Sequence, residues 1–233
     1  MAGKSTGIFK SLNCGLGSSD KKKNILENLL IVSNKIKAQH KKIILLKQVH
    51  SNNFHYISQN SKLNSNKFEG DALITDKKDL SLAILTADCA PILIYDEGKE
   101  MIAAIHAGWK GAYKDIIKRV VNFMIKKGCL PKNITAAIGP CISINNYEVK
   151  EDFKKKFIKK DKINIIFFKK IKNKNYFNLN KYIRFQLESL NIKKIDIVNK
   201  DTFVAKNNFF SARRSISRKE NDYGRNISII MIN

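Results

Sequence analysis

The chain has 233 residues, of which 43% are hydrophobic, and its formal net charge is +24. This length fits one large domain or two small ones, and it suffices for a core without disulfides or a structural metal. No apolar run approaches the roughly 18 residues of a membrane-spanning helix, and the first residues lack the apolar stretch of a secretory signal. We therefore expect a cytoplasmic protein with no membrane partner.

The excess of basic residues raises nucleic acid as a partner. Only six of the 44 basic residues are arginine, however, and the lysines are spread through a chain that is also rich in asparagine and isoleucine. A dedicated nucleic-acid reader would be expected to cluster arginine, whose planar guanidinium recognises phosphate and guanine. We expect weak, salt-sensitive binding rather than a specific nucleic-acid partner.

The first predicted element is a helix from Asp20 to about Gln39, where apolar residues recur at helical spacing. Five strand-like runs follow, rich in Ile, Leu and Val: KIILLKQV, DALIT, LAILTAD, PILIYD and MIAAI. A second helix is predicted from Tyr113 to Met124, with Asp115 in its first turn and Gly128 as a stop.

The second half of the chain continues with the strand-like run NITAAIG and then the Lys-rich block 151–175, in which Lys alternates with Phe and Ile. That alternation indicates a solvated face above an apolar one. A third helix is predicted from Leu179 to Leu190, and IDIV and NISIIMI predict the last strands. Because only some strands are separated by a helix, a mixed sheet or two packed sheets with outer helices fits better than a regular doubly wound fold. We predict one α/β domain.

Three of the strand-like runs lead into metal ligands. KIILLKQV leads to His50, LAILTAD to Cys89 and MIAAI to His106. Strands of one sheet can bring their ends to a common edge, and two imidazoles with one thiolate suit catalytic zinc, which leaves a fourth position for water or substrate. Asp88, beside Cys89, could orient a ligand or accept a proton.

A simpler interpretation of these residues remains open. A lone cysteine in an apolar strand is usually a small buried hydrophobic residue, and a lone histidine is usually a satisfied polar group. The spacings between the three residues match no short metal-binding motif. The four cysteines form no Cys-x-x-Cys pair, which indicates reduced thiols.

Two further segments predict anion binding. In HAGWKGAYKDII, glycines precede a predicted helix, whose free N–H groups favour phosphate, and Lys110 would strengthen the attraction. The alternative is an ordinary strand-to-helix turn. In FFSARR, Arg213 and Arg214 follow an aromatic pair, and the fixed geometry of arginine suits phosphate or carboxylate.

Taken together, the segments KQVH, GDALIT, TADCAPILIYD, AAIHAGWKGAY, AIGPCISINNYEV, FFSARR and YGR resemble the YfiH-like family. Its members are also called multicopper polyphenol oxidase or laccase-domain proteins and purine nucleoside phosphorylases. The resemblance implies a single α/β domain over 1–233 with two packed mixed β-sheets flanked by helices. Because Met1 falls at the glycines of the family's T-R-x-G-G segment, we expect an N-terminally short domain that lacks the family's first Arg.

The resemblance also implies zinc on His50, Cys89 and His106, and phosphorolysis of adenosine, inosine, guanosine and methylthioadenosine, with deamination of adenosine. The partners would be purine nucleosides and phosphate, and the protein would be a monomer or a homodimer. The residues that we expect to be catalytic are Cys89, His106 and Asp88. Those that we expect to bind substrate are Asn13, Gln48, Lys110, Arg213 and Arg214.

Two other enzyme functions stay open, and so does a non-catalytic basic binding protein. Polyphenol oxidation by a laccase-type copper centre needs on the order of eight to ten imidazoles, and the chain has four histidines, so we expect copper to act only incidentally in vitro. Alternatively, Cys89 and His106 could act without metal as nucleophile and base in a hydrolase or amidase. The family resemblance implies, for such an enzyme, the editing of cell-wall precursors.

Overall fold

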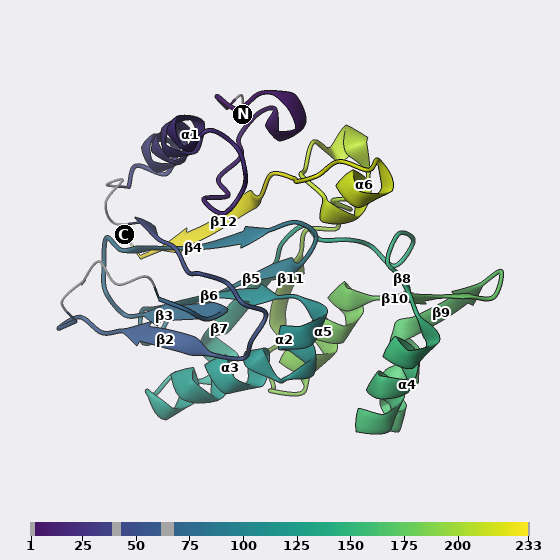
Figure 1. Cartoon of the computed structure of the whole chain (residues 1–233). Coiled ribbons are helices and arrows are strands. Elements are labelled where there is room, and N and C mark those ends of the chain that lie inside the picture. Colours follow the sequence, from purple (N-terminus) through teal and green to yellow (C-terminus); the bar gives the residue numbers. More distant parts are fainter. Residues whose placement is uncertain (1–2, 39–42, 62–67, 233) are drawn as a thin grey trace.

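The computed structural model describes residues 3–38, 43–61 and 68–232. Their strands form a six-stranded sheet and two three-stranded sheets. The larger sheet lies in the middle of the molecule, between a three-stranded sheet covered by α1 (Lys22–Lys35) and a layer of helices (Figure 1). This confirms the predicted α/β class with two packed mixed sheets, and it adds a third sheet that was not predicted.

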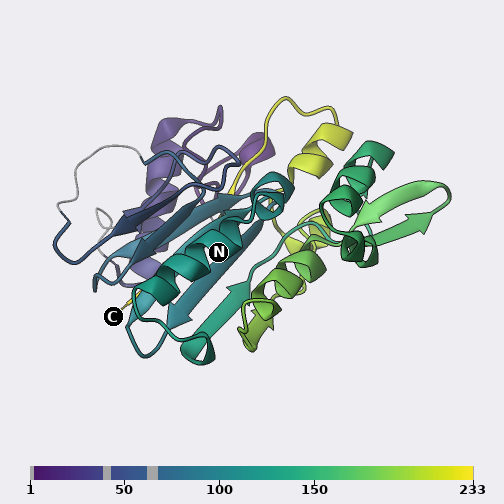
Figure 2. The same cartoon turned by 90° about the horizontal axis from the view of Figure 1, so that it is seen from below.

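The central sheet contains the most apolar strands, and every residue of β6 and β3 is buried. Its order is β11 (Lys194–Ile197), β7 (Ile134–Ile138), β5 (Ala90–Asp96), β6 (Met101–Ala107), β3 (Ala72–Thr75) and β2 (Phe54–Ile57). The inner strands pair antiparallel, whereas each edge strand is parallel to its neighbour. Burial on both faces explains why these strands are continuous apolar runs. The helices α3 (Ile116–Lys126) and α5 (Leu179–Glu188) cover one face (Figure 2).

The second sheet packs on the opposite face of the central one. It consists of β1 (Ile43–Ile44), β4 (Ser81–Thr86) and β12 (Asn226–Met231). Leu82 and Ile84 of β4 pack against Leu73 and Ile102 of the central sheet. Because side chains alternate along a strand, Leu85 faces the other way and packs against the cluster of α1.

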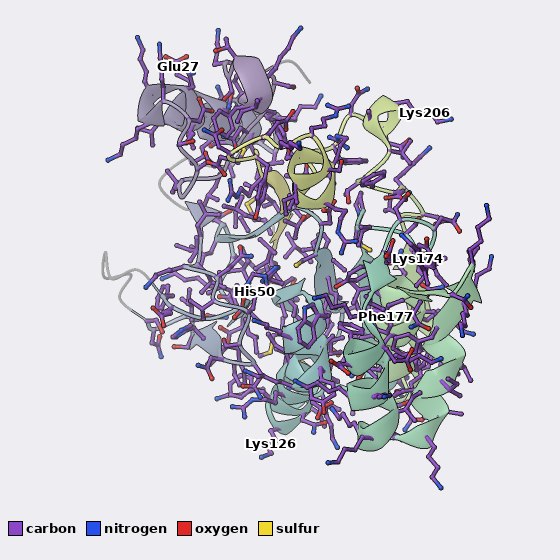
Figure 3. The ribbon with its side chains drawn as sticks, turned by 45° about the vertical axis from the view of Figure 1, so that its right-hand side comes forward. Glu27, His50, Lys126, Lys174, Phe177 and Lys206 are labelled. Carbon is purple, nitrogen blue, oxygen red and sulfur yellow. The ribbon has the colours of Figure 1, made fainter. Side chains whose placement is uncertain are left out.

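The third sheet is formed by the Lys-rich block and the residues before it. It contains β8 (Glu148–Val149), β10 (Lys174–Phe177) and β9 (Phe168–Ile171), next to α4 (Glu151–Lys160) and the 3-10 helix Lys162–Phe167. The lysines are mostly exposed, whereas Phe157 and Phe177 are buried with ring centroids 4.8 Å apart (Figure 3). A solvated face thus covers an aromatic cluster, as predicted.

Several predicted boundaries are wrong. Of the described residues of the run KIILLKQV, only the two of β1 belong to a strand, and Lys47 forms an isolated bridge with Glu69. The helix predicted from Tyr113 is two helices, α2 (Trp109–Tyr113) and α3, because Asp115 adopts a left-handed conformation with φ of 63° between them. The first helix ends at Lys35, and Gln39 lies outside the described residues. No helix in the described ranges has the length and apolar composition needed to cross a membrane.

Candidate metal centre and active site

Two imidazoles and one thiol meet at one end of the central sheet. The ligand atoms of His50, Cys89 and His106 all lie within 4.8 Å of one another. Sγ of Cys89 is 3.7 Å from Nε2 of His50, and the two imidazole centroids are 4.8 Å apart. A tetrahedral zinc ion with bonds of about 2.0–2.3 Å would separate sulfur from nitrogen by about 3.6 Å. The three side chains therefore have the composition and spacing of a three-ligand metal site.

Strand pairing brings two of these ligands together. His106 lies in β6 opposite Pro91 of β5, and Cys89 directly precedes β5, so the antiparallel pair places sulfur and imidazole at the same sheet end. His50 is in a loop, six residues after β1, with φ of 57°. The expectation that a strand ends at each ligand is therefore wrong for His50, and also for Cys89, which lies three residues after the end of β4 and directly before β5. Figure 3 shows His50 between the layer that contains Glu27 and the layer that contains Lys126.

The buried carboxylate of Asp71 positions this cluster. One oxygen lies 2.8 Å from Nδ1 of His106 and accepts a hydrogen bond from the backbone N–H of His50 at 3.0 Å. The other oxygen accepts hydrogen bonds from the N–H and the hydroxyl of Ser51, at 2.5 and 2.7 Å. Because Asp71 engages Nδ1, Nε2 of His106 is left to bind a metal, as in carboxylate–histidine–metal arrangements.

Gly108 leaves the space that the sulfur and imidazole occupy. A Cβ at this position would lie 2.8 Å from Sγ of Cys89 and 3.0 Å from Cδ2 of His50. Its backbone (φ −72°, ψ 167°) is an ordinary extended conformation, so the glycine is needed for space and not for backbone freedom. The ligands converge only because this residue has no side chain.

The charges of the cluster favour a thiolate. Burial raises the pKa of the Cys89 thiol, but the charge of His106 and hydrogen bonds from His106 and His50 outweigh burial and lower it. Burial lowers the pKa of His106, but the charge of Cys89 and the hydrogen bond to Asp71 raise it above its ordinary value. For Asp71, burial is outweighed by hydrogen bonds from His106 and Ser51, which lower its pKa to about 2. A thiolate beside imidazoles is the donor set that zinc prefers.

The metal centre opens into a cavity of about 480 Å³. All three candidate ligands line it, together with apolar side chains that include Leu16, Leu45 and Leu85. One wall joins distant parts of the chain, because the N–H of Arg225 donates to Oδ1 of Asn13 at 2.9 Å. Arg225 also lines the cavity, and its guanidinium lies 4.1 Å from the ring centroid of Tyr223. The cavity is therefore lined by the three candidate metal ligands, by apolar side chains and by one arginine.

The structure places Asp88 in a supporting position. One carboxylate oxygen accepts a hydrogen bond from the hydroxyl of Thr202 at 2.6 Å, and the other accepts one from the backbone N–H of Arg213 at 2.8 Å. Asp88 does not line the cavity, and it is Asp71 that contacts a ligand histidine. The structure therefore does not place Asp88 at the cavity as a proton acceptor. Asp88 instead fixes the loop next to Cys89 through its two hydrogen bonds.

The two arginines of FFSARR have partners outside the metal cavity. The guanidinium of Arg214 donates to the backbone oxygens of Thr202, Phe203 and Phe209, so its donors are used within the fold. Arg213 donates to the backbone oxygen of Glu148 at 3.1 Å and lines a different groove. Neither residue contributes to the cavity that contains the metal ligands.

The other candidate substrate residues are divided. Gln48 lines the cavity, and its amide is held by the N–H and the carbonyl of Leu85. Asn13 is fully buried and supports the wall through the backbone of Gly15 and Arg225. Lys110 is exposed on α2 with Nζ 5.8 Å from the ring centroid of Trp109, outside the cavity lining.

Asp71 and Arg225 are functional candidates that were not singled out from the sequence. Each lies in a segment that carried the family resemblance, Asp71 in GDALIT and Arg225 in YGR. An acidic residue just before a buried strand was a usable signal for Asp71. Nothing local marks Arg225, whose place depends on contacts with residues 13–15.

Comparisons with known proteins identify the family and the fold. A family model described as multi-copper polyphenol oxidoreductase laccase matches residues 1–233. A purine nucleoside phosphorylase of Rickettsia prowazekii is 36% identical over 198 residues, which are 82% of this chain and 78% of that protein. Another, from Bacteroides thetaiotaomicron, is 31% identical over 223 residues, 91% of this chain and 83% of that protein. The crystal structure of the hypothetical protein YfiH of Bacillus licheniformis has a TM-score of 0.89 and 28% identity, covering 100% of this chain and 90% of its own.

These matches extend over nearly the whole chain, and they confirm the resemblance that the motifs indicate. The fold, the full-length family match and relatives above 30% identity agree. The chain therefore belongs to the family described as multi-copper polyphenol oxidoreductase laccases, the YfiH-like family.

Proposed function

We propose that this chain is a zinc-dependent purine nucleoside phosphorylase that acts on adenosine, inosine, guanosine and methylthioadenosine, and that it also deaminates adenosine. The observation that carries the proposal is the cluster of His50, Cys89 and His106 on the floor of the 480 Å³ cavity. This volume lies within the about 300–1,000 Å³ of small-molecule sites. The relatives named purine nucleoside phosphorylase support the reaction class.

Three side chains would hold the zinc ion, through Nε2 of each histidine and Sγ of Cys89. A zinc ion there would supply Lewis-acid polarisation and a lowered pKa of bound water. Asp71 keeps His106 oriented by its contact with Nδ1. Gly108 keeps the space between Cys89 and His50 clear.

Arg225 is the residue that we propose to hold phosphate. One guanidinium nitrogen forms an ion pair with Asp222 at 2.9 Å and donates to the backbone oxygen of Tyr223, and the group lies over the Tyr223 ring, so its position is fixed; its other two nitrogens would donate to phosphate. Leu16, Leu45 and Leu85 would pack against the purine and exclude water. In the reaction, a phosphate oxygen bonds to C1′ of the ribose while the bond from C1′ to the purine nitrogen breaks, and the base leaves with that electron pair.

The test is incubation of zinc-loaded protein with inosine and phosphate. We expect hypoxanthine and ribose 1-phosphate in equal amounts, and no product from Cys89→Ala, which lacks one ligand. Arg225→Gln should raise the KM for phosphate about tenfold, because it removes a charge-assisted contact. A preparation with one zinc per chain that releases no hypoxanthine would contradict the proposal. A separate assay of inosine formation from adenosine tests the deamination.

One observation favours a second candidate, a metal-free cysteine hydrolase. Cys89, His106 and Asp71 form a chain of contacts in which the pKa of the thiol is lowered and the imidazole is held by a carboxylate. This is the arrangement of a nucleophile, a base and an orienting acid. Rapid alkylation of Cys89 together with amidase turnover in zinc-free protein would favour it. Loss of all turnover on zinc removal favours the phosphorylase.

A further inference from the structure

A second groove lies on the surface formed by α2, β8 and α4, and it has a volume of about 440 Å³. It shares no lining residue with the metal cavity. Figure 1 shows α4 and β8 beside the main body of the fold. The residues that line this groove are Trp109, Tyr147, Glu148, Val149, Lys150, Asp152, Phe153, Lys156 and Arg213.

The groove has aromatic walls that are only partly buried. The rings of Trp109 and Phe153 have centroids 5.0 Å apart, and those of Tyr147 and Phe153 are 6.4 Å apart. Partly exposed aromatic side chains can stack on planar heterocycles with little sequence or base preference. The walls therefore suit a flat aromatic ligand.

Cations are positioned at the same walls. The guanidinium carbon of Arg213 lies 5.5 Å from the Tyr147 centroid, and Nζ of Lys156 lies 5.4 Å from the Trp109 centroid. Neither residue forms an ion pair with another described residue. Of the two acids in the groove, Glu148 is already paired with Lys174 at 2.9 Å. Together with Lys150, the groove therefore has an excess of positive charge next to its aromatic surface.

We propose that this groove binds a nucleotide, with the base stacked on the aromatic walls and the phosphate at Arg213 and Lys156. A nucleoside would lack the charged contact, and a sugar phosphate would lack the stacking surface. The proposal does not depend on any reaction in the metal cavity.

The groove is connected to the metal centre through two short paths. Arg213 donates its backbone N–H to Asp88, which precedes Cys89. Trp109 follows Gly108, which abuts Cys89 and His50. A nucleotide in the groove would therefore contact Arg213 and Trp109, each of which is separated from a metal ligand by a single intervening residue.

Trp109 is the only tryptophan of the chain, so its fluorescence reports directly on the groove. The experiment titrates inosine 5′-monophosphate into the zinc-loaded protein in phosphate-free buffer, where inosine cannot undergo phosphorolysis. We expect saturable quenching by inosine 5′-monophosphate. The affinities of inosine and of ribose 5-phosphate, measured in the same way, should be about tenfold lower.

Three variants locate the binding. Lys156→Gln should lower the affinity for inosine 5′-monophosphate about tenfold. Lys155→Gln removes the same charge from the neighbouring exposed position of α4, outside the groove, and should leave the affinity within about twofold. Arg225→Gln alters the metal cavity and should also leave it unchanged. Absence of saturable quenching, equal affinities for Lys156→Gln and the unmodified protein, or a loss confined to Arg225→Gln would each overturn the proposal, whether or not inosine is a substrate.

Discussion

The substitution Gly108→Ala isolates the space requirement of the metal centre. The new Cβ would start 2.8 Å from Sγ of Cys89 and 3.0 Å from Cδ2 of His50, whereas non-bonded carbon atoms prefer about 3.5–4.0 Å. The sulfur would have to retreat by about 0.7 Å or more, several times the about 0.2 Å tolerance of metal–ligand distances. Because the backbone of Gly108 is extended with φ of −72°, alanine fits its conformation, and the fold should be retained.

We therefore expect Gly108→Ala to lower zinc affinity about 10- to 100-fold, measured by competition with a chromogenic chelator. The melting temperature of the zinc-free protein should change little, which a thermal scan checks. Gly17→Ala is the matched control, because Gly17 lines the same cavity and its Cβ would meet nothing within 4 Å. Zinc affinity in Gly108→Ala within twofold of the Gly17→Ala value would refute the space argument.

Three further outcomes follow from the site. Asp71→Asn should weaken zinc binding about 10- to 100-fold by releasing His106, measured by the same competition, while Asp76→Asn, just after the far end of β3, should not. Zinc affinity should rise about tenfold per pH unit from neutral pH until the raised pKa of His106 is passed, because zinc binding displaces the proton of His106. Cys89 adds no further pH dependence in this range, because its lowered pKa leaves the thiol already ionised. A flat pH profile of zinc affinity would contradict this. In zinc-free protein at neutral pH, iodoacetamide should alkylate Cys89 before Cys141, since burial and nearby negative groups raise the pKa of the Cys141 thiol; mass spectrometry of early time points identifies the modified residue.

The central sheet was predictable because its strands are buried on both faces and read as short apolar runs. PILIYD and MIAAI correspond closely to β5 and β6. The third sheet was not predicted, since β9 and β10 carry exposed lysines, β10 buries the polar residue Asn175, and α4 buries only Phe157. The left-handed residue Asp115, which divides one predicted helix into α2 and α3, has no signature in the apolar spacing.

The metal ligands could be predicted as residue types, but their support could not. His106 and Cys89 converge because β5 pairs with β6; the apolar pattern predicts these two strands but not their pairing. The position of His50 depends on a loop held by Asp71, a contact between residues 21 positions apart. The arginine that lines the cavity belongs to YGR and not to FFSARR, because the three backbone oxygens around Arg214 engage its guanidinium within the fold. Such tertiary contacts are invisible to spacing along the chain.

The wall in which Arg225 meets Asn13 joins positions 212 residues apart, and Ser19 and Asp222 add a second link. During synthesis on the ribosome, all three metal ligands are therefore made long before Arg225 completes the wall of the cavity. Cleavage by a protease between α6 (Ala212–Ser217) and Asp222 would leave Arg225 on a separate fragment from the three metal ligands, held to the fold only by β12 and the contacts with Asn13 and Ser19. Under the proposed function, phosphate binding would thus depend on the integrity of a segment that holds Arg225 and no metal ligand.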